Sequence, residues 1–213
     1  MLVLERRDFI VAGSVMLAGA LAAPAWAAQP VILVVGDSLS AEYGLKRGSG
    51  WVALLEKKLA QEKISARVVN ASISGDTTSG GRSRLPALLA QHKPTHVLLE
   101  LGGNDALRGL PLSMTEVNLA HMTQAAQKAR AKVLVIGIQV PPNYGSDYGN
   151  RFSAIFEKVA RANKAAVVPF LLRGVADGPD AAAMFQPDRI HPTEQAHPIM
   201  LANVWPELRK LLQ

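Results

Sequence analysis

Five short apolar stretches rich in β-branched residues recur along the chain, and segments with helical periodicity separate them. The predicted strands are residues 31–35, 66–70, 96–101, 132–139 and 166–170. Apolar runs of this length and composition are typical of buried strands. Because buried strands alternate with helices, the pattern predicts an α/β domain in which helices cover both faces of a five-stranded parallel sheet, a three-layer α/β/α arrangement.

The helical segments show apolar residues three or four positions apart. In the first helix the predicted buried positions are Trp51, Leu54, Leu55 and Leu59, and in the last they are Ala202, Trp205, Leu208, Leu211 and Leu212. Further helices are expected over residues 85–91, 115–130 and 152–164. No internal repeat or Pro/Ser-rich linker divides this region, so we predict a single domain over residues 29–213.

Most of the Gly, Asn, Asp and Pro residues lie in the segments that follow the predicted strands. These segments are residues 36–50, 74–81, 102–111, 141–149 and 173–192. Right-handed crossovers bring all loops after parallel strands to one edge of the sheet, where ligands bind in open α/β sheets. We therefore expect the functional residues in these loops.

Residues 1–28 have the pattern of a secretory signal peptide. Arg6 and Arg7 precede an uncharged apolar stretch, residues 9–23, and the small-x-small cleavage pattern Ala25-Trp26-Ala27 follows it. The run from Arg6 to Phe9 also resembles a twin-arginine signal, with Sec export as the alternative. A third alternative is an uncleaved membrane anchor, since the apolar stretch approaches the length that spans a bilayer. We predict a periplasmic or secreted protein without a stable membrane span after cleavage.

The net charge and the composition of the chain exclude several classes of function. The chain of 213 residues has a net charge of +6 and a pI near 9.8, and the charges of the leader cancel, so the basic character belongs to the domain. Lys and Arg are scattered without interleaved aromatic residues, so we predict no nucleic-acid binding; a basic surface equally favours anionic lipid head groups or phosphate-bearing substrates. The absence of cysteine excludes a thiol nucleophile and thiolate metal ligands.

A serine follows the first predicted strand directly, in Gly36-Asp37-Ser38-Leu39-Ser40. A hydroxyl at the carboxyl end of a buried strand stands where ligands bind, so Ser38 is a candidate nucleophile. The alternative is a serine that caps the next helix.

Serine needs a base to become a nucleophile, and the base needs an orienting group. In Asp188-Arg189-Ile190-His191-Pro192 a carboxylate precedes an imidazole by three positions, which lets Asp188 hold one ring nitrogen while the other faces Ser38. The alternatives are a solvated loop histidine at position 191 and His197 as the base. The remaining histidines, His92, His96 and His121, lie within or beside predicted elements, and no spacing indicates a metal site.

Acyl transfer also needs donors for the oxyanion. Candidates are the backbone N–H of Ser38, the loop Ser74-Gly75-Asp76, and the side-chain amide of Asn104 in Gly102-Gly103-Asn104-Asp105. Turn formation is the alternative role for each glycine and for the asparagine.

These fragments, taken with Asn70-Ala71-Ser72-Ile73 before Ser74, resemble in order and spacing the SGNH hydrolases, also called the GDSL esterase/lipase family, from about residue 31 to 212. The resemblance implies a flavodoxin-like α/β/α fold and a serine esterase that needs no cofactor. It implies Ser38 as nucleophile, His191 as base and Asp188 as its orienting acid, with Ser38, Gly75 and Asn104 forming the oxyanion hole. Asp37 is then expected to hold the nucleophile loop by hydrogen bonds.

The family also implies small-molecule substrates, namely fatty-acyl esters or thioesters including lysophospholipids, and a monomer is expected. Val140, Pro141 and Tyr144 are predicted to line an acyl groove, with ordinary loop packing as the alternative. Glu42, where many relatives carry a small residue, is expected either to influence the choice of charged acyl carriers or to be a solvated loop residue. Two other functions stay open: a carbohydrate acetyl esterase of the same family, and a non-catalytic binding domain.

Overall fold

The computed structural model describes residues 29–213, so the predicted signal peptide lies outside the described residues. One parallel sheet has the strand order β2-β1-β3-β4-β5. Its strands are β1 Val31–Gly36, β2 Arg67–Asn70, β3 His96–Glu100, β4 Lys132–Ile136 and β5 Ala166–Val168. All five predicted strands are confirmed, although β4 ends three residues earlier than expected, at the turn where Gly137 donates its N–H to Val168.

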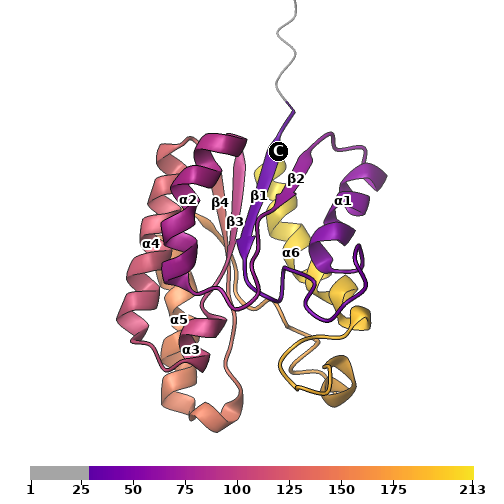
Figure 1. Ribbon diagram of the computed structural model, residues 1–213, viewed down its shortest axis with the longest axis vertical. Helices are drawn as coiled ribbons and strands as arrows, with labels where there is room; N and C mark the ends of the chain where they lie inside the picture. Colours follow the sequence, from indigo (N-terminus) through magenta and orange to yellow (C-terminus); the bar gives the residue numbers. More distant parts are fainter. Residues whose placement is uncertain (1–28) are drawn as a thin grey trace, which may run out of the picture.

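Helices cover both faces of the sheet. They are α1 Trp51–Gln61, α2 Thr78–His92, α3 Gly103–Leu107, α4 Leu112–Lys128, α5 Ser146–Ala162 and α6 His197–Leu212. The short 3-10 turns are η1 Pro142–Tyr144, η2 Ala181–Met184 and η3 Glu194–Ala196. α1 packs against α6 on one face, and α2, α4 and α5 pack side by side on the other (Figure 1). The predicted three-layer α/β/α fold is confirmed.

The centre of the core is formed by β1 and β3. Ile32 to Val35 and Val97 to Leu99 have no exposed surface, because both faces of these strands lie under helices. Burial of each such side chain contributes about 1.5–3 kcal/mol of transfer free energy. The chain runs from β1 to β2 on one side and then returns to β3 on the other. The end of β1 is therefore a switch point of the sheet, where ligands bind in this class of fold.

Helix α2 begins seven residues earlier than predicted. The side-chain oxygen of Thr77 accepts a hydrogen bond from Gly80, which caps the helix. The glycines that suggested a loop are needed for packing: a Cβ at Gly81 would lie 2.3 Å from a methyl carbon of Leu101. The predicted loop 74–81 is therefore helical from Thr78 onward.

The predicted inner face of the last helix is partly wrong. Ala202 is exposed, whereas Met200, Val204 and Leu208 are buried. The larger residues Trp205, Leu211 and Leu212 flank this stripe and are half-buried. No helix of residues 29–213 is long and apolar enough to cross a membrane.

Candidate active site

Ser38 lies in a tight turn directly after β1. The carbonyl of Asp37 accepts hydrogen bonds from the N–H groups of Ser40, at 3.2 Å, and Ala41, at 2.9 Å. Only a residue without a side chain fits before this turn, because a Cβ at Gly36 would lie 2.8 Å from both Glu100 Oε2 and Ser40 Oγ. Close packing of the β1 end against β3 thus fixes the direction in which Ser38 leaves the sheet.

The structure brings Ser38, His191 and Asp188 together across 153 positions of the sequence. Ser38 Oγ lies 2.9 Å from His191 Nε2, and His191 Nδ1 lies 2.6 Å from Asp188 Oδ2. The other carboxylate oxygen, Asp188 Oδ1, accepts the backbone N–H groups of Ile190 and His191, each at 3.0 Å. These bonds hold the pKa of Asp188 down at about 2, so the carboxylate stays ionised at neutral pH. In this arrangement His191 can remove the Ser38 proton while Asp188 holds its ring.

Three N–H donors follow the ends of β1, β2 and β3. In residues 29–213 no acceptor is found for the backbone N–H of Ser38 or of Gly75. Gly75 has φ +79°, which favours glycine, and its carbonyl accepts a 2.7 Å hydrogen bond from Arg108. Asn104 Nδ2 donates one hydrogen to Asp37 Oδ2 at 3.0 Å, which leaves its second hydrogen available. Such donors can stabilise an oxyanion formed at Ser38.

A family model described as the GDSL-like Lipase/Acylhydrolase family matches residues 34–199. The chain belongs to this family. It is 54% identical over 186 residues to "Esterase TesA" of Pseudomonas aeruginosa, covering 87% of this chain and 91% of the relative. It is 44% identical to "Thioesterase 1/protease 1/lysophospholipase L1" of Escherichia coli K12, covering 87% and 86%. The crystal structure of the esterase EstA from Pseudoalteromonas, inhibited by monoethylphosphonate, superposes with a TM-score of 0.80 at 38% identity and covers 86% of this chain and 99% of EstA. The sequence-based assignment to the family is confirmed, and the chain is an ester hydrolase.

Beneath the nucleophile turn of this GDSL hydrolase lies a buried carboxyl group that the sequence did not single out. Glu100, at the end of β3, has no exposed surface, and its Oε2 accepts the hydroxyl of Ser40 at 2.6 Å. The same hydroxyl accepts the indole N–H of Trp51 at 3.2 Å. Burial and the neighbouring Asp37 raise the pKa of Glu100 well above its usual value. This hydrogen-bonded group supports the nucleophile turn from below.

Asp37 itself is buried, with 2% of its surface exposed. Its Oδ1 accepts the Leu39 N–H at 3.0 Å, and its Oδ2 accepts the Asn104 amide. Burial raises the pKa of Asp37 to about 6 against the opposing effect of these bonds. Asp37 thus links the nucleophile turn to the Asn104 loop, as the sequence predicted for a supporting residue.

Two further residues contact the base. The ring of Tyr43 lies over that of His191, with centroids 4.2 Å apart and planes tilted by 34°. Gln186 donates its backbone N–H to the His191 carbonyl at 2.8 Å and its side-chain amide to the carbonyls of Tyr43 and Pro192, both at 3.0 Å. The sequence pattern indicated neither Tyr43 nor Gln186, because each reaches the base only where two distant loops meet in the fold.

His197 and His96 have structural roles. His197 is buried, and its Nδ1 accepts the N–H of Trp51 at 3.0 Å. Burial lowers its pKa to about 4. His96 is buried between Thr95 and the Leu211 carbonyl, and burial lowers its pKa. His197 was the alternative candidate for the base, but its Nδ1 binds the first residue of α1.

Glu42 folds back onto its own loop. Its carboxylate accepts the N–H groups of Gly48, at 3.0 and 3.1 Å, and Gly50, at 2.8 Å. Glu42 is therefore a clamp of the loop before α1 rather than a freely solvated residue, and its influence on charged acyl carriers stays a prediction.

The predicted groove residues lie on the loop after β4, at the edge that carries Ser38. Pro141 is exposed, Val140 packs partly against the core, and the ring of Tyr144 stacks on Tyr148 at 5.8 Å. Their contact with substrate stays a prediction. Among residues 29–213, no three His, Asp or Glu side chains gather in a way that would hold a metal ion.

Proposed function

We propose that this chain is an exported serine esterase that hydrolyses fatty-acyl esters and thioesters through an acyl-enzyme on Ser38. The observation that carries the proposal is the continuous chain of short contacts from Ser38 Oγ through the His191 ring to Asp188. Membership of the GDSL hydrolases supports the reaction class.

In the first step His191 Nε2 takes the Ser38 proton as Oγ attacks the substrate carbonyl carbon. The protonated ring then gives that proton to the leaving alcohol or thiol, and the acyl group stays on Oγ. In the second step His191 activates a water, which releases the acid and restores Ser38. Asp188 stays ionised throughout and stabilises the charged imidazole.

During both steps the negative charge of the tetrahedral intermediate is placed among the Ser38 N–H, the Gly75 N–H and the Asn104 amide. Loss of one such donor typically costs about 10²- to 10³-fold in rate. Asp37 holds the Asn104 amide in place by the 3.0 Å bond, so that no reorganisation is required when the charge develops.

The fatty-acyl preference is supported by the relatives named as thioesterase and lysophospholipase, and by the apolar loop that holds Val140, Pro141 and Tyr144. An acyl chain that lies along this loop gains affinity with each methylene it buries, about 0.8 kcal/mol per CH₂. We therefore expect kcat/KM to rise from acetyl to medium-chain esters.

A panel of p-nitrophenyl esters from acetyl to dodecanoyl, together with medium- and long-chain acyl-CoA and a lysophospholipid, tests the proposal. The expected result is a rise of at least about tenfold in kcat/KM between acetyl and octanoyl esters, since several methylenes are buried. Ser38→Ala is the control and should lose hydrolysis of every substrate. A strict preference for acetyl groups on sugars would instead indicate a carbohydrate acetyl esterase, and no hydrolysis at all would indicate a binding domain.

A further inference from the structure

Four turns from a helix to the next strand each place a cationic residue in the left-handed backbone region. These residues are Lys63, Lys93, Arg130 and Lys164, with φ of 57°, 45°, 66° and 52°. Glycine or asparagine is the usual choice there, so the backbone does not require a cation. In a parallel α/β sheet all such turns lie at the edge where the strands begin, opposite the edge that carries Ser38 (Figure 1).

Seven further Lys and Arg residues of the domain lie at the same edge. We define the basic face as these four turns, the first residues of β2 and β4, and the last helical turns. The latter two groups contribute Arg67, Lys132, Lys58, Lys128, Arg161, Arg209 and Lys210. Helix dipoles favour the cations in the last helical turns. Helix dipoles do not account for Arg67 and Lys132, because these two residues belong to strands.

Little negative charge balances the basic face. Among the described residues, Glu62 pairs with Lys58 at 2.7 Å and with Arg209 at 4.0 Å, and Glu207, in the preceding turn of α6, pairs with Lys210 at 2.7 Å. In residues 29–213 none of the four turn cations, nor Arg67, forms an ion pair, and all five are exposed. Their charge is therefore free to meet an external anion.

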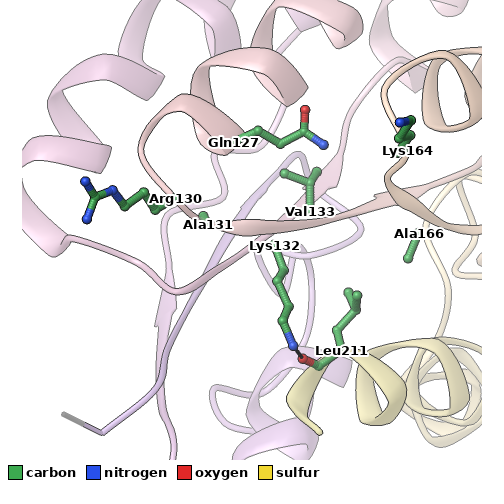
Figure 2. A pocket seen from close by; sticks show the side chains of 8 residues that line it. All are labelled: Gln127, Arg130, Ala131, Lys132, Val133, Lys164, Ala166 and Leu211. Carbon is green, nitrogen blue, oxygen red and sulfur yellow. Dashed lines mark hydrogen bonds between the residues drawn. The ribbon is translucent and has the colours of Figure 1, made fainter. Parts of the chain in front are cut away.

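A cavity of about 360 Å³ indents this face between α4, β4, β5 and the end of α6. Lys132 reaches across it to the Leu211 carbonyl, with Arg130 and Lys164 on either side (Figure 2). The side-chain amide of Gln127 adds a polar group to the wall. Cations around a shallow hollow suit a phosphate-bearing head group.

We propose that the basic face binds the surface of an anionic phospholipid bilayer. The cations follow the strand order β2-β1-β3-β4-β5, so they spread over about 20 Å of the sheet edge at the usual strand spacing. A spread of this kind fits a planar charged surface.

The position of the leader points to the same partner. β1 begins at this edge, between β2 and β3, and the apolar stretch 9–23 lies shortly before it in the sequence. Whenever that stretch lies in a membrane, the basic face is the part of the domain next to the bilayer. The Ser38 edge then faces the aqueous side and stays open to soluble esters.

Co-sedimentation with vesicles tests this proposal on the purified protein. Vesicles containing phosphatidylglycerol should bind it at low salt far more strongly than vesicles of pure phosphatidylcholine, and salt should release it. Each cation near an anionic surface contributes about fivefold to binding, so K63Q/K93Q/R130Q/K164Q should weaken it by at least about 100-fold and K93Q/K164Q by about 25-fold.

The matched control, K46Q/R47Q/R151Q/R173Q, removes the same charge from exposed positions toward the Ser38 edge and should bind within about threefold of the parent, because these cations face away from the bilayer. Hydrolysis of a soluble p-nitrophenyl ester, unchanged in all variants and in the vesicle-bound protein, shows that the fold and the orientation are as described. Equal loss of binding in both quadruple variants would overturn the proposal. Equal binding to both vesicle types, or binding to duplex DNA without binding to vesicles, would overturn it as well.

Discussion

At the scale of single residues, two side chains hold the ring of His191 in place. One ring edge is held by Asp188, and one face is covered by Tyr43, whose own side chain is 49% exposed. When His191 takes the Ser38 proton the ring becomes a cation, and the electron-rich face of a tyrosine attracts a cation. Tyr43 is therefore a positioning residue for the base, whose ring it contacts directly.

Replacement of Tyr43 tests this role. Tyr43→Leu should lower kcat by about 2- to 10-fold with little change in KM, because an exposed aromatic contact contributes about 0.5–1.5 kcal/mol. Tyr43→Phe keeps the ring and should retain the kcat of the parent. An unchanged kcat in Tyr43→Leu, or an equal loss in Tyr43→Phe, would contradict the role.

At the scale of elements, the site depends on how two loops meet. The loop after β1 carries Ser38 and Tyr43, and the loop before α6 carries Asp188 and His191. Gln186 joins them, since its amide donates to Tyr43 and Pro192 and its backbone N–H donates to His191. The distance from Ser38 to the base is therefore set partly by one side chain outside the triad.

Gln186→Ala should loosen this junction. The expected result is a fall in kcat of about tenfold, which corresponds to the loss of one or two hydrogen bonds at about 1 kcal/mol each. KM should change little, because Gln186 is not one of the oxyanion donors and does not belong to the predicted acyl groove. Thermal unfolding serves as the control for a general loss of structure. A parallel loss of kcat and of global stability, with full activity restored at low temperature, would argue against a positioning role.

The ends of β1 and β3 hold two carboxyl groups, Asp37 and Glu100, whose pKa values are raised chiefly by burial. For an acid with a raised pKa the folded state binds more protons than the unfolded state. The stability that Glu100 contributes is therefore complete below its pKa in the unfolded state, near 4.5. This contribution is lost as the pH rises toward the pKa of Glu100 in the folded state. His197, with its lowered pKa, opposes this trend between pH 4 and 6.5.

Glu100→Gln isolates the effect, because the amide keeps an acceptor for Ser40 and does not titrate. We expect the stability of this variant relative to the parent to grow with pH from 5 to 8, by up to about 1.4 kcal/mol per pH unit. Urea unfolding of both proteins at several pH values measures the difference, and their shared histidines cancel. A difference that stays constant over this range would show that Glu100 is ionised in the folded protein.

At the scale of the whole molecule, the sequence predicted the sheet, its five strands and the five residues proposed as triad and oxyanion donors, because buried strands and the loops after them are local patterns. It did not predict the helical start at Thr78, since Gly80 and Gly81 resemble loop residues until their close packing against Asp76 and Leu101 is known. Contacts between distant segments, such as that of Gln186 with Tyr43, have no local signal at all.

The predicted leader can be tested on the full chain. We expect cells that make the complete protein to remove residues 1–28, so that the recovered enzyme starts at Gln29 and is active, because the predicted domain begins there. Intact-mass measurement of the protein from the periplasmic and membrane fractions checks this. Recovery of the full-length mass in the membrane fraction alone would show that the leader is an uncleaved anchor.

The central claim is that His191 and Asp188 activate Ser38, and covalent labelling tests it most directly. A fluorophosphonate should modify the protein in a one-to-one ratio, and peptide mass spectrometry should place the adduct on Ser38. His191→Gln should slow labelling by about 10³-fold or more, since the base activates the hydroxyl, and Ser38→Ala should abolish it. Labelling of another residue, or full labelling of Ser38→Ala, would contradict the account.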